Sequence, residues 1–305
     1  MRLGAVYING QVNAFYRMYL PMTAMQRRGH EIVEVLQERG TPLPVERLVD
    51  CDLVHIHRLL LMDDDDDSVE RLRAAGVAVG FDDDDNTGVA PPELERFVAE
   101  GSLPRAKRDF ERLLARVAGV DLVTTPSDDL ADCFEAAGAR NVEVIDNYLP
   151  DAFNRVKPRG HEGIVIGWHA ASEHALDVEE LGLRELMLEL LERHPELRVV
   201  TIGVDLGLEH ERYAREDFMP IGDLTQRLAD FDVGIAPLAD TPFNRGRSNV
   251  KAREYAAAGV PWLASPVGSY EHLGPDEGGQ LVEDGEWLDA LEELIRSRRA
   301  RAKQA

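Results

Sequence analysis

The stretch FNRGRSNVKAREYAAAGVPWLAS, residues 243–265, combines a predicted helix start with positively charged side chains. One of the two residues Ser248–Asn249 is a typical first residue of a helix, and Gly259 is a typical end. Unpaired N–H groups give the first turn of a helix positive partial charge, so carboxylates are favoured there. Here the same region carries Arg247 and Lys251, which indicates a site for an anion.

The anion that suits this site is a phosphate or a diphosphate. The helix follows the apolar run DVGIAPL, so its N-terminus is expected at the carboxyl edge of a sheet, where N–H groups and cations bind phosphates. Arg247, Lys251 and Glu254 are spaced to share one side of the helix. Glu254 is placed to accept hydrogen bonds from vicinal hydroxyls, as an acidic residue does for a ribose. The alternative is that the cations pair with some of the 57 carboxylates.

The elements that must position these residues form two series of strands alternating with helices. Expected strands in the first series are 2–8, 31–35, 51–57, 77–82, 121–125 and 142–146, with helical patterns at 13–28 and 103–117. Expected strands in the second are 164–168, 197–204, 232–238 and 260–264, with helices at 174–193, 223–230, 249–258 and 286–299. Such alternation predicts doubly wound parallel sheets.

The polar segment 149–163, which holds two prolines and two glycines, is the best candidate for a linker. The sequence therefore predicts an α/β protein of two Rossmann-like domains, 1–150 and 151–305, facing a cleft. Because ligands of such sheets bind at the carboxyl ends of the strands, that cleft is the expected active site.

Composition excludes several classes of function. The 305 residues carry a formal net charge of −23, which argues against a nucleic acid or an anionic lipid surface as a partner. The chain has only two cysteines and no apolar run long enough to span a bilayer, so we expect a cytoplasmic protein without disulfides.

The segment 243–265 resembles the donor-binding segment of GT-B glycosyltransferases of the family 4-like branch. Its core matches the pattern S-x-x-K-x-x-E-Y followed by G-[IV]-P, and the similarity runs through roughly residues 5–290. The resemblance implies that Glu254 binds the donor ribose and that the backbone N–H groups of Asn249 and Val250 meet the donor phosphates. It also implies transfer with retention of anomeric configuration, with the nucleotide-sugar as co-substrate and no other cofactor.

Two positions depart from that pattern. Family members carry a second glutamate that falls on Gly246 here, and an arginine and a lysine after the first strand of the second domain, where this chain reads GWHAASEH. Trp168 replaces the arginine, and His174 is the nearest polar candidate for the lysine. His174 is therefore predicted either to contact phosphate or to face solvent at a helix start. His169 is expected to be a loop residue.

Candidate residues in the first domain lie at the ends of predicted strands. Asp82 and Asp83, in FDDDDN, should reach the cleft and could accept a proton from the acceptor hydroxyl or orient it; the alternative is a set of solvated carboxylates. His57 shares a strand face with His55 and is nearer the strand end.

The remaining acceptor-side candidates follow the first strand. The NG pair, Asn9 and Gly10, has a backbone flexible enough to admit substrate, but an ordinary turn is equally consistent. Arg17 could meet an anionic acceptor, or form an ion pair on a helix surface. We find no constellation with the spacing of a metal site, since the histidine pair lacks a third ligand.

The sequence thus predicts a glycosyltransferase that uses a nucleotide-sugar and needs no metal, because two cations and a helix N-terminus can stabilise the leaving diphosphate. The second domain would hold the nucleotide and the first the acceptor, which could be a glycan, a lipid, a protein or a small molecule. Two alternatives remain: another GT-B enzyme, such as a nucleotide-sugar epimerase or a phosphorylase, and a catalytically inactive sugar-nucleotide binder.

Overall fold

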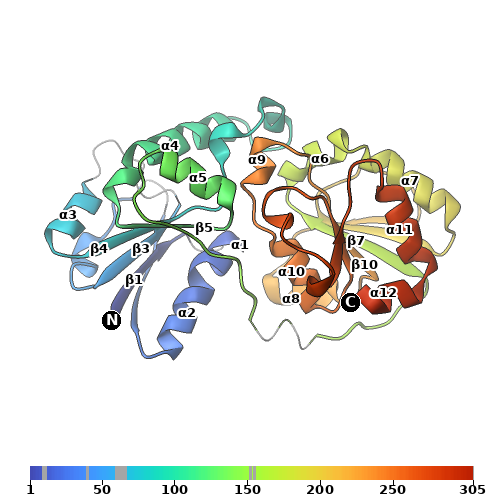
Figure 1. Ribbon diagram of the computed structural model, residues 1–305, viewed down its shortest axis with the longest axis horizontal. Helices are drawn as coiled ribbons and strands as arrows, with labels where there is room; N and C mark the ends of the chain where they lie inside the picture. The colour runs from blue at the N-terminus through green and yellow to red at the C-terminus, as the bar shows by residue number, and fades with distance from the viewer. Residues whose placement is uncertain (9–11, 39–40, 59–66, 151–152, 154–155, 305) are drawn as a thin grey trace. The chain divides into compact units, whose positions relative to one another are not determined.

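The apolar strands build two separate six-stranded sheets, which Figure 1 shows with helices packed against both faces of each. The computed structural model describes residues 1–8, 12–38, 41–58, 67–150, 153 and 156–304. The chain divides into two compact units. The first contains Met1–Ala90, Leu103–Tyr148 and Arg245–Ser248, and the second contains Pro91–Ser102, Leu149–Asn244 and Asn249–Ala305.

The sheet of the first unit is parallel throughout, and its strand order reverses beside β1 (Arg2–Tyr7). Its strands, in spatial order, are β2 (Glu31–Leu36), β1 (Arg2–Tyr7), β3 (Leu53–His57), β4 (Ala78–Asp82), β5 (Leu122–Thr125) and β6 (Val142–Val144). Because β1 pairs with both β2 and β3, the strand order reverses beside β1, which is where such sheets bind ligands.

The two faces of this sheet are covered differently. The larger core joins alternate strand residues, such as Val54, Ile56 and Phe81, to Leu72, Leu113 and Phe134 of three helices. These helices are α3 (Ser68–Ala74), α4 (Ser102–Arg116) and α5 (Asp128–Ala136). A smaller core on β1 receives α1 (Val12–Ala14), the π-helix η1 (Phe15–Tyr19) and α2 (Leu20–Arg27). Such π-turns recur at functional sites.

The second unit has the strand order of a dinucleotide-binding fold. Its strands, in spatial order, are β12 (Gly279–Leu281), β11 (Trp262–Ala264), β10 (Val233–Ala236), β7 (Ile164–Ala170), β8 (Leu197–Gly203) and β9 (Tyr213–Glu216). Counted within the unit this order is 6-5-4-1-2-3, so the winding reverses between β7 and β10.

Two apolar cores cover the faces of the second sheet. One packs Ile166 and Trp168 against α7 (Leu183–Arg193) and α11 (Trp287–Arg296), and the other packs Val165 against α8 (Ile221–Leu228) and α10 (Val250–Ala257). Figure 1 shows these two pairs of helices on opposite sides of β7 and β10. The remaining helices are α6 (Ala175–Glu180), α9 (Pro242–Arg245) and α12 (Arg298–Gln304).

The predicted fold class, with two doubly wound parallel sheets, is confirmed, and every strand expected from the sequence is present with each end within two residues of the expected one. The expectation missed the short edge strands β9 and β12. The single helix expected at 174–193 is instead two, because Gly182 takes a left-handed conformation with φ of 61°. Among the described helices, none is both long and apolar enough to cross a membrane.

Candidate functional site

The second unit gathers polar residues where the order of its strands reverses. Helix α10 follows β10, and its buried Glu254, 1% exposed, lies 2.7 Å through Oε2 from Nε2 of His169 near the end of β7. The expectation that His169 is a loop residue is therefore wrong, because the ring projects from a strand. The Tyr255 hydroxyl accepts a hydrogen bond from the His169 backbone N–H at 3.2 Å and donates to the carbonyl of Ile235 at 3.1 Å. Tyr255 thus fastens β7 to β10 beside Glu254.

The residue before α10 does not cap the N-terminus of this helix. Asn249 precedes the helix, but its amide oxygen accepts from Arg253 Nε at 2.7 Å and its amide nitrogen donates to the Ser269 carbonyl at 3.0 Å. Within the described chain its side chain therefore does not cap the helix, and the first turn, which starts at Val250, carries no acidic residue. Backbone N–H groups at such a terminus favour a bound phosphate or carboxylate.

Lys251 lies in this first turn and meets a buried histidine. Its Nζ is 3.2 Å from Nε2 of His174, and Nδ1 of His174 is 2.7 Å from Oδ2 of Asp177. His174 is 2% exposed, so the alternative of a solvent-facing histidine is wrong. The structure thus pairs Lys251 with His174 and Glu254 with His169, and the lysine and the glutamate lie on the same short helix.

Arg247 does not lie on α10, contrary to the expected alignment of Arg247, Lys251 and Glu254 along one side of a helix. It falls in the connection between α9, which ends at Arg245, and α10, which begins at Val250. The segment Arg245–Ser248 packs with the first unit. Arg247 and Lys251 are four residues apart but do not lie on one helix. Arg247 precedes the first residue of α10 by three positions.

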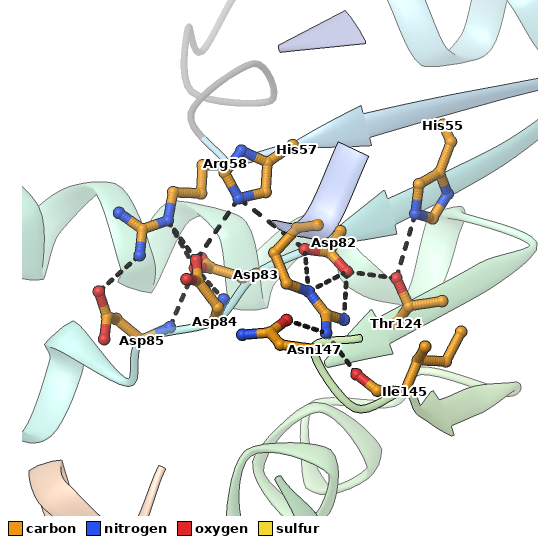
Figure 2. A network of polar contacts seen from close by, with 11 residues as sticks. His55, His57, Arg58, Asp82, Asp83, Asp84, Asp85, Thr124, Ile145 and Asn147 are labelled. Atoms are coloured by element: carbon orange, nitrogen blue, oxygen red, sulfur yellow. Dashed lines mark hydrogen bonds and ion pairs between the residues drawn. The ribbon is translucent and has the colours of Figure 1, made fainter. Parts of the chain in front are cut away.

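In the first unit, the part of the sheet face opposite the main core that β3, β4 and β5 form is polar. His55 and His57 of β3, Asp82 of β4 and Thr124 of β5 alternate with the core residues of their strands, so they share this face. The ring of His55 crosses over Gly80 to reach the hydroxyl of Thr124, with Nε2 3.1 Å from Oγ1 (Figure 2). Burial lowers the pKa of His55 to about 4, so the ring is neutral at physiological pH.

Asp82 is the centre of a buried ion pair. Arg17 from the π-helix donates through Nε to both carboxylate oxygens at 3.1 Å and through Nη2 to Oδ2 at 2.7 Å, and the hydroxyl of Thr124 donates to Oδ2 as well. Arg17 also donates to Asn147 and to the carbonyl of Ile145. Burial by itself would raise the pKa of Asp82, but attraction and hydrogen bonds from Arg17 bring it below its usual value. The expected alternative of an Arg17 ion pair on a helix surface is wrong, because both side chains are buried.

The three following aspartates surround a second arginine, as Figure 2 shows. Arg58 Nε lies 2.6 Å from Oδ1 of Asp84 and its Nη2 lies 2.5 Å from Oδ2 of Asp85. Arg58 has a φ of 52°, a left-handed conformation that is strained for a residue with a side chain. His57, fully buried, points Nε2 at Oδ1 of Asp84 over 3.4 Å. These contacts contradict the alternative of solvated carboxylates, at least for Asp82–Asp84, which are each less than 9% exposed.

Asp83 differs chemically from its neighbours. Its Oδ1 accepts the backbone N–H of Asp84 at 2.8 Å and lies 3.6 Å from Arg58 Nε. Burial, with repulsion from Asp84 and Asp85 added, outweighs the attraction of Arg58 and raises the pKa of Asp83 to about 7. A carboxyl group that titrates near neutrality can take or give a proton at physiological pH. By contrast, attraction from Arg58 and His57 lowers the pKa of Asp84 despite its burial.

Two further expectations concern ligands and the first loop. Asn9 and Gly10 lie outside the described residues. Among the residues that are described, no three His, Cys, Asp or Glu side chains converge in a way that could hold a metal ion.

Sequence reasoning missed several residues of these clusters. Asp177 had a readable signal, since it follows His174 by three residues at a helix start and so faces the same side. Arg58 had a weaker one, as a cation at the end of a predicted strand. Asn244, which donates to Asp177 Oδ1 at 2.7 Å, had none, because the contact joins residues 67 positions apart.

No protein-family model matches this chain, and no curated protein matches it. Solved structures do match it over nearly its whole length. An α-glucosyltransferase in complex with UDP aligns with 100% of this chain and 93% of its own, at 12% identity and a TM-score of 0.69. The HepE protein of Anabaena, in complex with UDP and glucose, aligns with 99% of this chain and 92% of its own, at 16% identity and a TM-score of 0.63.

A protein of Listeria monocytogenes assigned as a UDP-N-acetylglucosamine 2-epimerase aligns with 99% of this chain and 90% of its own, at 11% identity and a TM-score of 0.57. Likeness at such low identity establishes the fold: the chain has the α/β architecture of the GT-B glycosyltransferases, with two parallel six-stranded sheets. Function has to be argued from the chain's own residues.

Proposed function

We propose that this protein is a glycosyltransferase, of the family 4-like kind, which transfers a sugar from a nucleotide-sugar donor to an acceptor in the cytoplasm. In this proposal residues 151–305 hold the donor and residues 1–150 present the acceptor, and the reaction retains the anomeric configuration without a metal ion. The fold supports it, because similar structures were determined with UDP bound.

One observation carries the proposal: Lys251, held by the buried His174, lies in the first turn of α10, one turn before the buried Glu254. Among the described residues, Asn249 does not cap that turn. Lys251 and the N–H groups of Asn249 and Val250 suit a diphosphate, and Glu254 suits the ribose hydroxyls. Helix α10 follows β10 at the reversal of strand order, the usual place for a nucleotide in this fold. Arg247, just before the helix, would add a second cation, and His174 would complete the donor set.

The chemistry follows from these roles. The bond between the anomeric carbon and the diphosphate oxygen breaks, the acceptor oxygen bonds to that carbon, and the acceptor hydroxyl loses its proton. Lys251 and the helix N-terminus would stabilise the negative charge that develops on the diphosphate. Asp83 would take the proton or orient the hydroxyl, with the Arg17–Asp82 pair fixing the electrostatics around it.

Calorimetric titration with UDP, GDP and ADP tests the donor site. Lys251→Ala or Arg247→Ala should weaken binding of the preferred nucleotide by about 1.5–3 kcal/mol, the range for hydrogen bonds to charged groups. Lys157→Ala, which removes an exposed lysine of the same unit, is the matched control and should leave affinity unchanged. Any sugar transfer found with the matching nucleotide-sugar should persist in EDTA. Unchanged affinity in both the Lys251 and Arg247 variants would contradict the donor site.

A nucleotide-sugar epimerase is the second candidate, because a structure assigned to that activity has the same fold. Incubation with UDP-N-acetylglucosamine distinguishes the two, since an epimerase changes the sugar configuration at one carbon and a transferase does not. Binding without transfer, hydrolysis or epimerisation would instead favour an inactive binder, which the residues Gly246 and Trp168 at the two departing positions also suggest.

A further inference from the structure

The contact between Lys251 and His174 defines the proton arrangement of the histidine. A lysine ammonium can only donate hydrogen bonds, so Nε2 of His174, 3.2 Å from Lys251 Nζ, has to be the acceptor. The ring is then neutral and carries its proton on Nδ1. The Nδ1–H group then donates to Oδ2 of Asp177, 2.7 Å away. This direction is required because an ionised carboxylate can only accept hydrogen bonds.

Asp177 is fixed in turn from the other side. Its Oδ1 accepts the backbone N–H of Ala239 at 3.0 Å and the amide nitrogen of Asn244 at 2.7 Å, and Asn244 also donates to the carbonyl of Ala239 at 2.9 Å. Both carboxylate oxygens are thus occupied, and Asp177 is 3% exposed. The indole of Trp168 packs edge-on against the His174 ring, with the ring centroids 5.8 Å apart.

We propose that Asp177 and His174 are positioning residues that aim the Lys251 ammonium at the donor diphosphate, with His174 held as the neutral Nδ1–H tautomer and not itself contacting the donor. The inference rests on the proposed function and assigns His174 an indirect role. The His174 imidazole orients the Lys251 ammonium. Because this ring lies between them, the negative charge of Asp177 stays farther from the phosphate site than a carboxylate bound directly to Lys251 would be. Direct attachment of Lys251 to a carboxylate would orient it equally well but would neutralise it.

The tautomer can be read directly. Protein labelled with ¹⁵N-histidine, studied by long-range ¹H–¹⁵N correlation at neutral pH and assigned with His174→Gln, should show His174 protonated on Nδ1 only. Asp177→Asn should move the proton to Nε2. In that variant the single amide oxygen is expected to keep the two donors from Ala239 and Asn244, so the amide nitrogen then faces Nδ1.

The consequence for binding can be measured with UDP by calorimetry. Asp177→Asn should weaken UDP binding by about fivefold to tenfold in the wild-type background and by less than twofold in Lys251→Ala, which is the coupling expected of residues in one network. Asp230→Asn is the matched control. Asp230 is also a buried, hydrogen-bonded aspartate of this unit, held by Arg159, and its loss should change neither the tautomer nor the affinity.

Each outcome decides one point. His174 found as the Nε2–H tautomer or as a doubly protonated ring overturns the positioning role, even if Asp177→Asn fails to fold. Equal weakening by Asp177→Asn with and without Lys251 also overturns it, because His174 would then act on the nucleotide directly. Unchanged UDP affinity in Lys251→Ala overturns the proposed donor site. In that case the tautomer of His174 still shows whether Asp177 and His174 orient the Lys251 ammonium.

Discussion

Two adjacent carboxylates of one strand end have opposite chemical properties. Asp82 receives three hydrogen bonds from Arg17, so its pKa falls although it is buried. Asp83 has Arg58 at 3.6 Å and two further aspartates beside it, so burial dominates and its pKa rises to about 7. The difference arises from partners, since the burial of the two side chains is similar. Of the two catalytic candidates, Asp83 is therefore the one suited to proton transfer, and Asp82 is suited to a fixed negative charge.

Asp83→Asn should alter the pH dependence of stability with a definite sign. The pKa of Asp83 is higher in the folded protein than the 3.8 of a free aspartate, so the folded state binds the extra proton between those values. Its contribution to the free energy of unfolding is therefore present below pH 4 and is lost as pH rises to about 7, by at most about 4 kcal/mol. Urea unfolding at pH 5 and pH 7.5 should show that Asp83→Asn lessens this decline, whereas Asp132→Asn, an exposed aspartate of α5, should not.

The same Asp83 variant separates acceptor chemistry from donor binding. With saturating donor, turnover of the wild-type protein should rise with pH through about 7, and Asp83→Asn should remove that rise and lower the rate, with nucleotide affinity unchanged. Glu254→Gln should do the reverse and chiefly weaken the nucleotide, because it removes the charge that strengthens hydrogen bonds from ribose. A loss of nucleotide affinity in Asp83→Asn alone would exchange the roles assigned to the two units.

At the scale of elements, one glycine allows the polar face of the first sheet to form. Gly80 of β4 pairs with His55 of β3, and the His55 ring lies across the space that a side chain would occupy. A Cβ at Gly80 would be 2.3 Å from Nδ1 of His55. Strand β4 is held by β3 on one side and β5 on the other, so its backbone has little room to withdraw. The strand therefore needs glycine here for the contact between His55 and Thr124.

Gly80→Ala should accordingly destabilise the first unit by about 1–3 kcal/mol, the usual range for overpacking a core. Gly222→Ala in α8 is the matched control, since a Cβ there has no neighbour within 4 Å and alanine favours a helix over glycine by about 0.5–1 kcal/mol. Midpoints of urea unfolding measure both. A Gly80→Ala protein as stable as the wild type would mean that the histidine ring moves aside freely.

The sequence predicts elements that depend on local patterns better than those that depend on contacts between residues far apart in the chain. Long apolar strands were predictable because their burial on both faces is local and readable, whereas β9, with four mostly half-buried residues, and β12, with three residues, carry too little pattern. The π-helix at Phe15–Tyr19 leaves no sequence signal, yet it is what carries Arg17 to Asp82. Lys251 and Glu254 were found because helix starts have local rules, while Asn244 joins Asp177 only through the tertiary fold.

At the scale of the whole molecule, each unit has its own sheet and its own apolar cores. The proposed donor contacts of Lys251 and Glu254 come from the second unit, and Arg247 would add one from a four-residue segment of the first. The carboxylates proposed to act on the acceptor all come from the first unit. Units with separate cores can unfold in separate transitions, and a ligand raises the stability only of the part that binds it. This organisation makes the division of roles testable without knowledge of the acceptor.

Differential scanning calorimetry should resolve two unfolding transitions, of which UDP raises only one. At 100 times its dissociation constant UDP adds about 2.7 kcal/mol to the unit that binds it, which for a unit of this size is a shift of roughly 5–10 °C. Gly80→Ala identifies the other transition, because it should lower only that of the first unit, and Lys251→Ala should reduce the UDP shift without moving either transition far in the absence of ligand. One transition that UDP moves as a whole would contradict the independence of the two cores. A UDP shift confined to the transition that Gly80→Ala lowers would place the nucleotide in the first unit, because binding energy appears only in the unit that holds the ligand.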